Sequence, residues 1–232
     1  MRLKPRKKIN SHEDRVPLRQ YARWDSFLMK MNVRFAWFAI LLLLCSCGSK
    51  RDPAKSILPA DCQLREGDVV FRKGSGLTSR VVIAAENNGA YSHVGIVVDS
   101  AGVKMIVHAV PGEPDFEGDE DRVKKESPEK FFSSVNAECG EVCRHVDSLA
   151  AKRAAAVALS IYKRHTLFDH DYNETDTTKM YCTQLVTHSY MRAGVPFNNL
   201  EREKVDFLVL HTNCVLPTGL LESDQLYSVY KF

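Results

Sequence analysis

Apolar and polar residues change their spacing along the chain, and this spacing predicts the secondary structure. Residues 67–72 are predicted to form a first strand, and the β-branched runs 91–98 and 103–110 flank a turn-rich Asp-Ser-Ala-Gly segment, which predicts a β-hairpin. Residues 149–164 are Ala-rich with apolar positions at helical spacing, which predicts a helix. A second helix is predicted over residues 181–194, because a terminal glycine caps it and a proline follows. One domain accounts for these elements.

The predicted hairpin has one apolar face and one face that carries histidines. A register symmetrical about the turn pairs Val98 with Val103 and gives a face made only of apolar side chains, namely Val94, Ile96, Val98, Val103, Met105 and Val107. The same register places His93 opposite His108 on the other face. Directly opposed Cβ atoms lie roughly 4.5 to 5.5 Å apart, which lets two imidazoles form a hydrogen bond. Gly95 follows His93 on that face and leaves room for another group to approach.

The N-terminal part of the chain has the composition of an export signal. Residues 35–45 are an uninterrupted apolar stretch, which is too short to span a bilayer and follows Lys30 and Arg34. We therefore assign residues 1–46 to a signal peptide, with a possible spurious extension before Met29 or Met31. A buried apolar helix is the alternative for this stretch. Residues 47–60 are polar and are predicted to tether a folded domain of residues 61–232.

Charge and cysteine content narrow the function further. The net charge of +3 comes from the leader, because residues 47–232 contain 22 Lys and Arg against 26 Asp and Glu. Nucleic-acid binding therefore loses its main support. Five cysteines lie beyond residue 47, and this odd number leaves at least one thiol unpaired. Residues 111–121 are acidic and are predicted to form a solvated loop. Our hypothesis is that this loop gates the substrate-binding groove of the protein or favours cationic groups of the substrate.

Cys182 is the candidate nucleophile. It lies at the start of the second predicted helix, where free N–H groups and the helix dipole favour a thiolate. An adjacent histidine is expected to lower the thiol pKa further. We assign His93 as general base and then acid, His108 as the residue that orients His93, and the N–H of Cys182 as an oxyanion donor.

Three segments carry a resemblance to a known family. Gly-Asp-Val-Val-Phe at 67–71, Tyr-Ser-His-Val-Gly-Ile at 91–96 and Tyr-Cys-Thr-Gln-Leu-Val at 181–186 resemble the signature blocks of circularly permuted NlpC-type papain-like cysteine hydrolases. The resemblance implies an α+β papain-like fold, with the catalytic helix packed on an antiparallel sheet. It also implies Tyr172 as an oxyanion or substrate donor, with Asp169 of the same segment as a second candidate. Many permuted relatives have Glu where this chain has His108, so a merely structural role for His108 stays open.

The resemblance extends to the leader. The run Leu-Cys-Ser-Cys at 44–47 resembles a bacterial lipobox, which implies that Cys47 is lipidated and anchors an exported protein in the cell envelope or periplasm. We expect hydrolysis of an amide through an acyl-enzyme, with a peptidoglycan stem peptide as substrate and no cofactor. The alternatives are acyl hydrolysis or transfer on a lipid substrate, a non-catalytic envelope-binding lipoprotein in which Cys182 is a core thiol, and a metal site formed by His93, His108 and Asp169.

Overall fold

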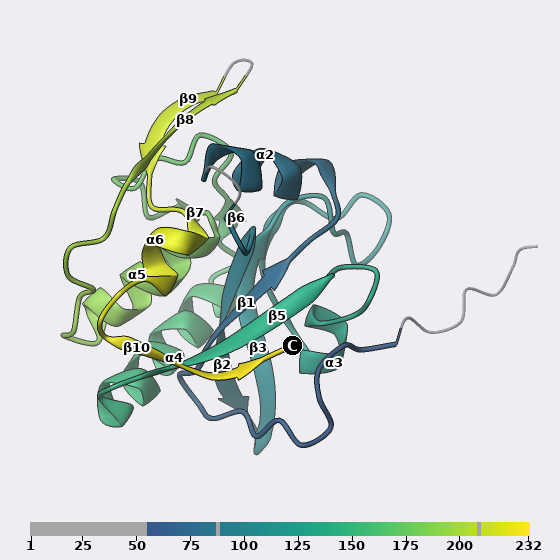
Figure 1. The fold of residues 1–232 in the computed structure, drawn as a ribbon, viewed down its shortest axis with the longest axis vertical. Helices are drawn as coiled ribbons and strands as arrows, with labels where there is room; N and C mark the ends of the chain where they lie inside the picture. Colours follow the sequence, from purple (N-terminus) through teal and green to yellow (C-terminus); the bar gives the residue numbers. More distant parts are fainter. Residues whose placement is uncertain (1–54, 87–88, 208–209) are drawn as a thin grey trace, which may run out of the picture. The chain divides into compact units, whose positions relative to one another are not determined.

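The fold is a mostly antiparallel sheet with helices on both faces (Figure 1). The structure, a computed structural model, describes residues 55–86, 89–207 and 210–232. Its elements are β1 (Val69–Lys73), α2 (Leu77–Ala85), β2 (His93–Ser100), β3 (Val103–Val110), β4 (Arg122–Glu126), α3 (Pro128–Phe131), β5 (Cys139–His145), α4 (Ser148–Lys163), β6 (Leu167–Phe168), β7 (Lys179–Met180), α5 (Cys182–Arg192), β8 (Glu203–Phe207), β9 (Leu210–Cys214), α6 (Pro217–Leu221) and β10 (Leu226–Lys231).

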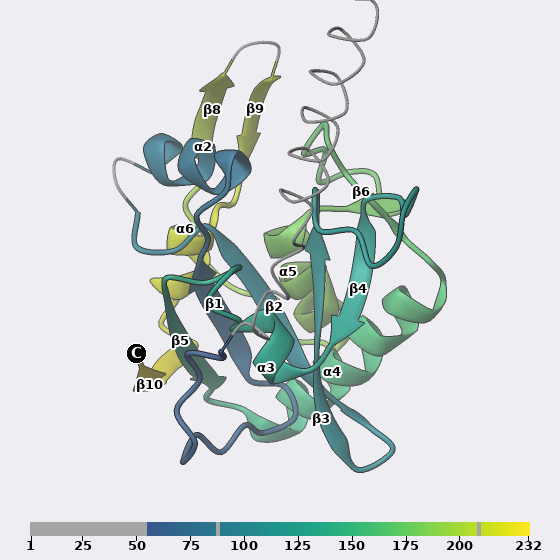
Figure 2. The ribbon, with the colours of Figure 1, turned by 90° about the vertical axis from the view of Figure 1, so that its right-hand side faces the viewer.

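Strand alternation divides the described core into two layers. The larger sheet has the strand order β10-β5-β1-β2-β3-β4-β6-β7. Val94, Ile96 and Val98 of β2 face a core shared with α4 and α5, whereas Val97 of the same strand packs with Phe131 of α3 on the opposite side. Because neighbouring residues of a strand point to opposite faces, this one strand serves both layers. Figure 2 shows α3 on one side of the sheet and α4 and α5 on the other.

The hairpin of β2 and β3 forms as predicted, but its register differs by two residues. Ser100 pairs with Val103 across a turn that Ala101 and Gly102 form with positive φ angles of 57° and 83°. This is a two-residue turn, which matches the twist of the strands. A shift of two keeps each side chain on its predicted face. However, Val103 is 58% exposed at the turn, so its predicted place on the core face is wrong.

Both predicted helices are confirmed, with local reasons for their ends. The carboxylate of Asp147 accepts N–H donors from Leu149 and Ala150, each at 2.9 Å, and so begins α4. The amide oxygen of Gln184 accepts the N–H of Tyr181 at 3.3 Å at the start of α5. Gly194 follows α5 with a φ of +87°, as a C-terminal cap requires.

Several described elements were not predicted from the sequence. These elements include α2, the interior strands β4 and β5 of the larger sheet, and the separate hairpin of β8 and β9. The proposed signal peptide and Cys47 lie outside the described residues. Among the helices of the described ranges, none has the length and apolar character to cross a membrane.

Candidate active site

Three buried side chains on neighbouring strands form a hydrogen-bonded chain, which we call the histidine relay: His93 on β2, His108 on β3 and Glu126 on β4. Nε2 of His93 lies 2.8 Å from Nδ1 of His108. Nε2 of His108 bonds to the carboxylate of Glu126. The three residues are 6%, 0% and 5% exposed, so water does not compete for these bonds. The predicted contact between His93 and His108 is therefore present.

The bonding order fixes the tautomers of the relay. An ionised Glu126 only accepts, so His108 donates its Nε2–H to the carboxylate and presents Nδ1 as an acceptor. His93 then donates from Nε2 to His108. Nδ1 of His93 consequently keeps its lone pair, which is the form a general base needs.

Gly95 makes this arrangement possible by its lack of a side chain. A Cβ atom at Gly95 would lie 3.2 Å from Cβ of His108 and 2.7 Å from Cγ2 of Ile106. The predicted room beside His93 is therefore used by His108 itself. His108 reaches His93 diagonally across the glycine, because the two-residue shift of register moves it away from the directly opposed position.

The surroundings keep His93 neutral and Glu126 ionised. Burial lowers the pKa of His93 well below its ordinary value, and the positive charge of Arg72 lowers it further. Burial raises the pKa of Glu126, but the hydrogen bond with His108 and the ion pair with Lys130 outweigh this and lower it to about 2. The ring of Phe131 packs at 5.7 Å from that of His93 and 5.1 Å from that of His108, so α3 covers the relay.

Cys182 is the first residue of α5, and this helix packs against β2. The backbone N–H groups of Val94 and Thr183 favour its thiolate form. Burial nevertheless raises the pKa of Cys182 to about 11, because desolvation outweighs these two donors. The prediction of a lowered thiol pKa is therefore wrong: the resting pair consists of a neutral thiol and a neutral imidazole.

The strand β2 links the two candidate groups, because it carries His93 and because α5, which begins at Cys182, packs against it. Val94, whose backbone N–H favours the thiolate of Cys182, directly follows His93 in the chain. Among the described residues, no hydrogen bond joins Sγ of Cys182 to a ring nitrogen of His93, whose partner is His108. The described contacts place His93 against α3, and they place Cys182 at the start of α5, which packs against the same strand β2.

Tyr172 lies on the same side as the thiol. Burial and the neighbouring Cys182 raise the pKa of Tyr172, which keeps its hydroxyl protonated as a donor. Its ring contacts that of Tyr181 with centroids 5.0 Å apart. Asp169 is 2% exposed and accepts the N–H groups of Asp171 at 2.9 Å and Asn173 at 2.6 Å. Asp169 is thus placed to shape the loop that carries Tyr172.

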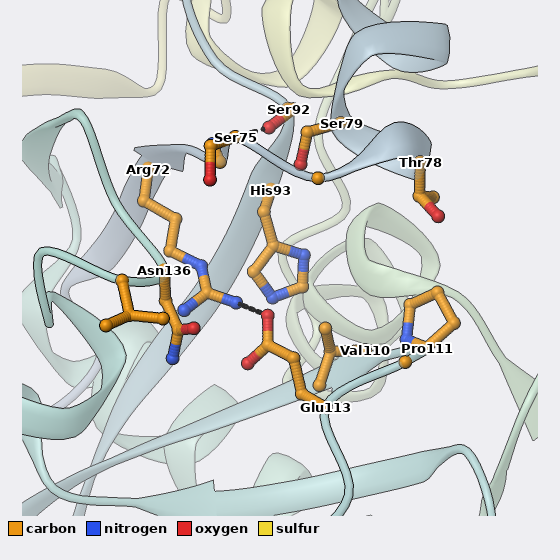
Figure 3. A pocket seen from close by; sticks show the side chains of 14 residues that line it. Arg72, Ser75, Thr78, Ser79, Ser92, His93, Val110, Pro111, Glu113 and Asn136 are labelled. Atoms are coloured by element: carbon orange, nitrogen blue, oxygen red, sulfur yellow. Dashed lines mark hydrogen bonds and ion pairs between the residues drawn. The ribbon is translucent and has the colours of Figure 1, made fainter. Parts of the chain in front are cut away.

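A cavity of about 340 Å³ opens beside His93 (Figure 3). Its lining includes Arg72 of β1, Ser79 of α2, Glu113 of the acidic loop and Asn136. Arg72 and His93 are paired positions of β1 and β2. Figure 3 shows the ion pair between Arg72 and Glu113 next to the imidazole of His93. The cavity therefore combines the relay with a buried charge.

The acidic loop 111–121 is held by bases. Nζ of Lys124, which is 3% exposed, lies 3.2 Å from Asp115 and 3.3 Å from Asp119. Arg122 also binds Asp119 at 2.9 Å, and Lys130 binds Asp115 at 2.5 Å. These ion pairs offset part of the negative charge of the loop, which weakens the hypothesis that it attracts cationic groups.

Neither a disulfide nor a metal site is found among the described residues. Cys62, Cys139, Cys143, Cys182 and Cys214 are free thiols. Within the described ranges, no group of three or more His, Cys, Asp or Glu residues is arranged to hold a metal ion. His93 and His108 bond to each other, and Asp169 binds backbone N–H groups instead of joining them.

Glu126 and Arg72 were not predicted to belong to the site. Glu126 ends a strand rich in charged residues, Arg-Val-Lys-Lys-Glu, which resembles an exposed edge. The one available signal was alternation, which places Glu126 and Lys124 on the same face as each other. Nothing in the sequence distinguishes the buried Arg72 from an arginine at the end of a solvated strand.

A cysteine at a helix N-terminus, packed on an antiparallel sheet beside a buried histidine, is the architecture of papain-like cysteine hydrolases. The family model described as "Permuted papain-like amidase enzyme, YaeF/YiiX, C92 family" matches residues 63–230, and the chain belongs to this family. The predicted membership of the permuted papain-like hydrolases is confirmed.

A solved structure supports the fold. It is titled as the metalloprotein yiiX from Escherichia coli O157:H7, and it matches with a TM-score of 0.57 and 19% identity. The match covers 74% of this chain and 99% of that one. A search of curated proteins gave no match. The permuted papain-like fold, of α+β class, is therefore established, together with membership of an amidase family.

Proposed function

We propose that the protein hydrolyses an amide bond of a cell-wall peptide through an acyl-enzyme on Cys182. The observation that carries this proposal is the hydrogen-bonded chain from Glu126 through His108 to His93, on the strand against which the helix of Cys182 packs. A buried relay of this kind holds one imidazole in a single tautomer, as a general base requires.

The reaction begins from neutral groups. When substrate binds, Nδ1 of His93 takes the thiol proton while the sulfur attacks the amide carbonyl carbon. The resulting oxyanion accepts the N–H of Cys182 and the hydroxyl of Tyr172. His93 then returns the proton to the leaving amine, and the C–N bond breaks. Water, deprotonated by His93, hydrolyses the thioester and restores the thiol.

His108 and Glu126 act through His93. As the imidazolium forms, the Nε2–H of His93 strengthens its bond to His108, and the negative charge of Glu126 stabilises the pair. Glu126 thus supplies the carboxylate that His108 lacks. This gives His108 an orienting role and argues against a merely structural one.

The choice of a peptidoglycan stem peptide rests on location. The leader of residues 1–46 and the lipobox-like Cys47 support an exported lipoprotein tethered to a membrane of the cell envelope, where this substrate lies. A lipid substrate would also be within reach of such an enzyme and is therefore included in the test. No cofactor enters the proposed reaction.

The experiment compares the purified protein, residues 47–232, with its Cys182→Ala variant. Each is incubated with muropeptides and, separately, with phospholipid vesicles, and the products are analysed by mass spectrometry. Muropeptides shortened by amide cleavage, with the wild-type protein alone, support the proposal. Release of fatty acid or acyl transfer instead would assign the lipid reaction, and no product from either substrate would refute both.

A further inference from the structure

The buried charge at Arg72 has no part in the reaction described above. The side chain of Arg72 is 2% exposed, and its acidic partner is Glu113, which is 26% exposed and belongs to the loop 111–121. A guanidinium at this depth requires an anion, because an unpaired buried charge is strongly destabilising. The anion here comes from a surface loop and not from the core.

Other contacts hold the guanidinium in place without Glu113. It donates to the carbonyl of Phe131 at 2.8 Å, and its Cζ lies 4.6 Å from the centroid of the Phe131 ring. Nε is buried and has no hydrogen-bond partner. The group therefore has a fixed orientation and a spare donor, and it lines the same cavity as His93.

We propose that Arg72 forms a carboxylate-binding subsite, that Glu113 occupies it in the free protein, and that a carboxylate of the substrate replaces Glu113 during binding. The planar guanidinium matches a carboxylate in a bidentate geometry, which the free Nε makes available. This inference deepens the proposed function and rests on it for one point, namely that the selected amide carries a free carboxylate on the residue next to the scissile bond.

The charge of Arg72 also affects His93, which lies beside it. Arg72 and His93 are paired across β1 and β2, and the positive charge of Arg72 contributes to the lowered pKa of His93. A substrate carboxylate would keep this charge neutralised while His93 carries the proton. A substrate without a carboxylate leaves Glu113 in place and the cavity occupied.

The test measures binding and not turnover, so its failure is distinct from failure of the proposed hydrolysis. The Cys182→Ala protein is titrated with N-acetyl-alanine and with N-acetyl-alaninamide, which differ only in the carboxylate, by NMR. Glu113→Gln in the Cys182→Ala protein should tighten the binding of N-acetyl-alanine by about tenfold, because the Glu113 carboxylate no longer competes for Arg72. The same substitution should leave the affinity for N-acetyl-alaninamide unchanged. Arg72→Lys should weaken the binding of N-acetyl-alanine by about tenfold, because Lys lacks the planar guanidinium that can bind a carboxylate with two hydrogen bonds.

The control is Glu117→Gln, which removes an exposed charge from the same loop and should change neither affinity. Equal binding of the two ligands to the Glu113→Gln protein would overturn the proposal. So would an unchanged or weakened carboxylate affinity in that variant, or the absence of measurable binding at millimolar concentration. If Arg72→Lys does not fold, the Glu113→Gln comparison decides the question alone.

Discussion

The two halves of the candidate site are built in different ways. The histidine relay is carried by three neighbouring strands, and its members are at most 6% exposed. The thiol side, which we define as Cys182, Tyr172 and residues 169–178, consists of a helix start and a loop. Gln184 of α5 donates to the carbonyl of Asp176 at 2.8 Å, and Asp169 accepts two loop N–H groups.

This difference separates two means of preorganisation. Ladder hydrogen bonds fix the relay, so that its geometry depends on register and on Gly95. Side-chain to backbone hydrogen bonds fix the thiol side, where Tyr172 adopts a positive φ of 52°. Changes on the thiol side should therefore act mainly on reactivity, whereas changes in the relay should act on folding stability as well as on turnover.

The largest expected effect is on turnover, from the thiol side. Cys182→Ala should lower amide hydrolysis by at least about 1000-fold, because no other described group is placed to form the acyl-enzyme. Initial rates on muropeptides measure this loss. Cys62→Ala removes a half-buried thiol outside the site and should retain full activity. Comparable activity in the Cys182 variant would exclude it as the nucleophile.

Thiol reactivity gives the next largest effect. With a pKa of about 11, Cys182 has a thiolate fraction at pH 8 that is about 100-fold below that of an ordinary cysteine. Its alkylation by iodoacetamide, followed by peptide mass spectrometry, should therefore rise steadily up to pH 10. A rate that levels off below pH 8 and depends on His93 would instead reveal a preformed ion pair.

Acid stability tests the relay. The pKa of Glu126 is lowered from its ordinary 4.5 to about 2, so its stabilising effect is present above pH 4.5 and is lost as the pH falls towards 2. The shift corresponds to about 3 kcal/mol. Glu126→Gln should lose about this much unfolding free energy at pH 7 and far less near pH 2, as measured by urea unfolding.

Glu129→Gln is the matched control for this test, because Glu129 is exposed on α3 nearby. It should leave the unfolding free energy nearly unchanged at both pH values. An equal loss for Glu126→Gln at pH 7 and pH 2 would show that its carboxylate is not preferentially stabilised in the folded protein.

The smallest expected effect concerns the register at Gly95. Gly95→Ala would place a methyl group 2.7 Å from Ile106 and 3.1 Å from the carbonyl of Val107, which costs about 1 to 3 kcal/mol by overpacking. Thermal unfolding measures this cost. Gly76→Ala, where no atom lies within 4 Å of the added group, should have little effect on stability. A stable Gly95 variant would show that the strands adjust easily.

The sequence predicted the elements that have strong periodicity. The hairpin, α4 and α5 were found from alternation, helical spacing and the cap at Gly194. The register was wrong because the Asp-Ser-Ala-Gly segment contains a two-residue turn and not a four-residue one. The contact between His93 and His108 was still found, because a shift of two preserves the faces of a strand.

Tertiary burial explains what could not be predicted. Glu126 and Arg72 belong to the site because α3 and the acidic loop cover them, and neither cover follows from local spacing. The predicted pKa of Cys182 was wrong for the same reason. The position at the helix start favours a thiolate, but desolvation by burial has the larger effect and raises the pKa.

The paired bases of loop 111–121 also bear on the speed of substrate capture. Four bases of the described ranges contact the loop, Arg72, Arg122, Lys124 and Lys130, and they cancel most of the field that its six carboxylates would otherwise project into solvent. Diffusional steering needs an unbalanced patch of charge and fades with ionic strength. Encounter with a charged peptide should therefore proceed at nearly the same rate in dilute and in concentrated salt.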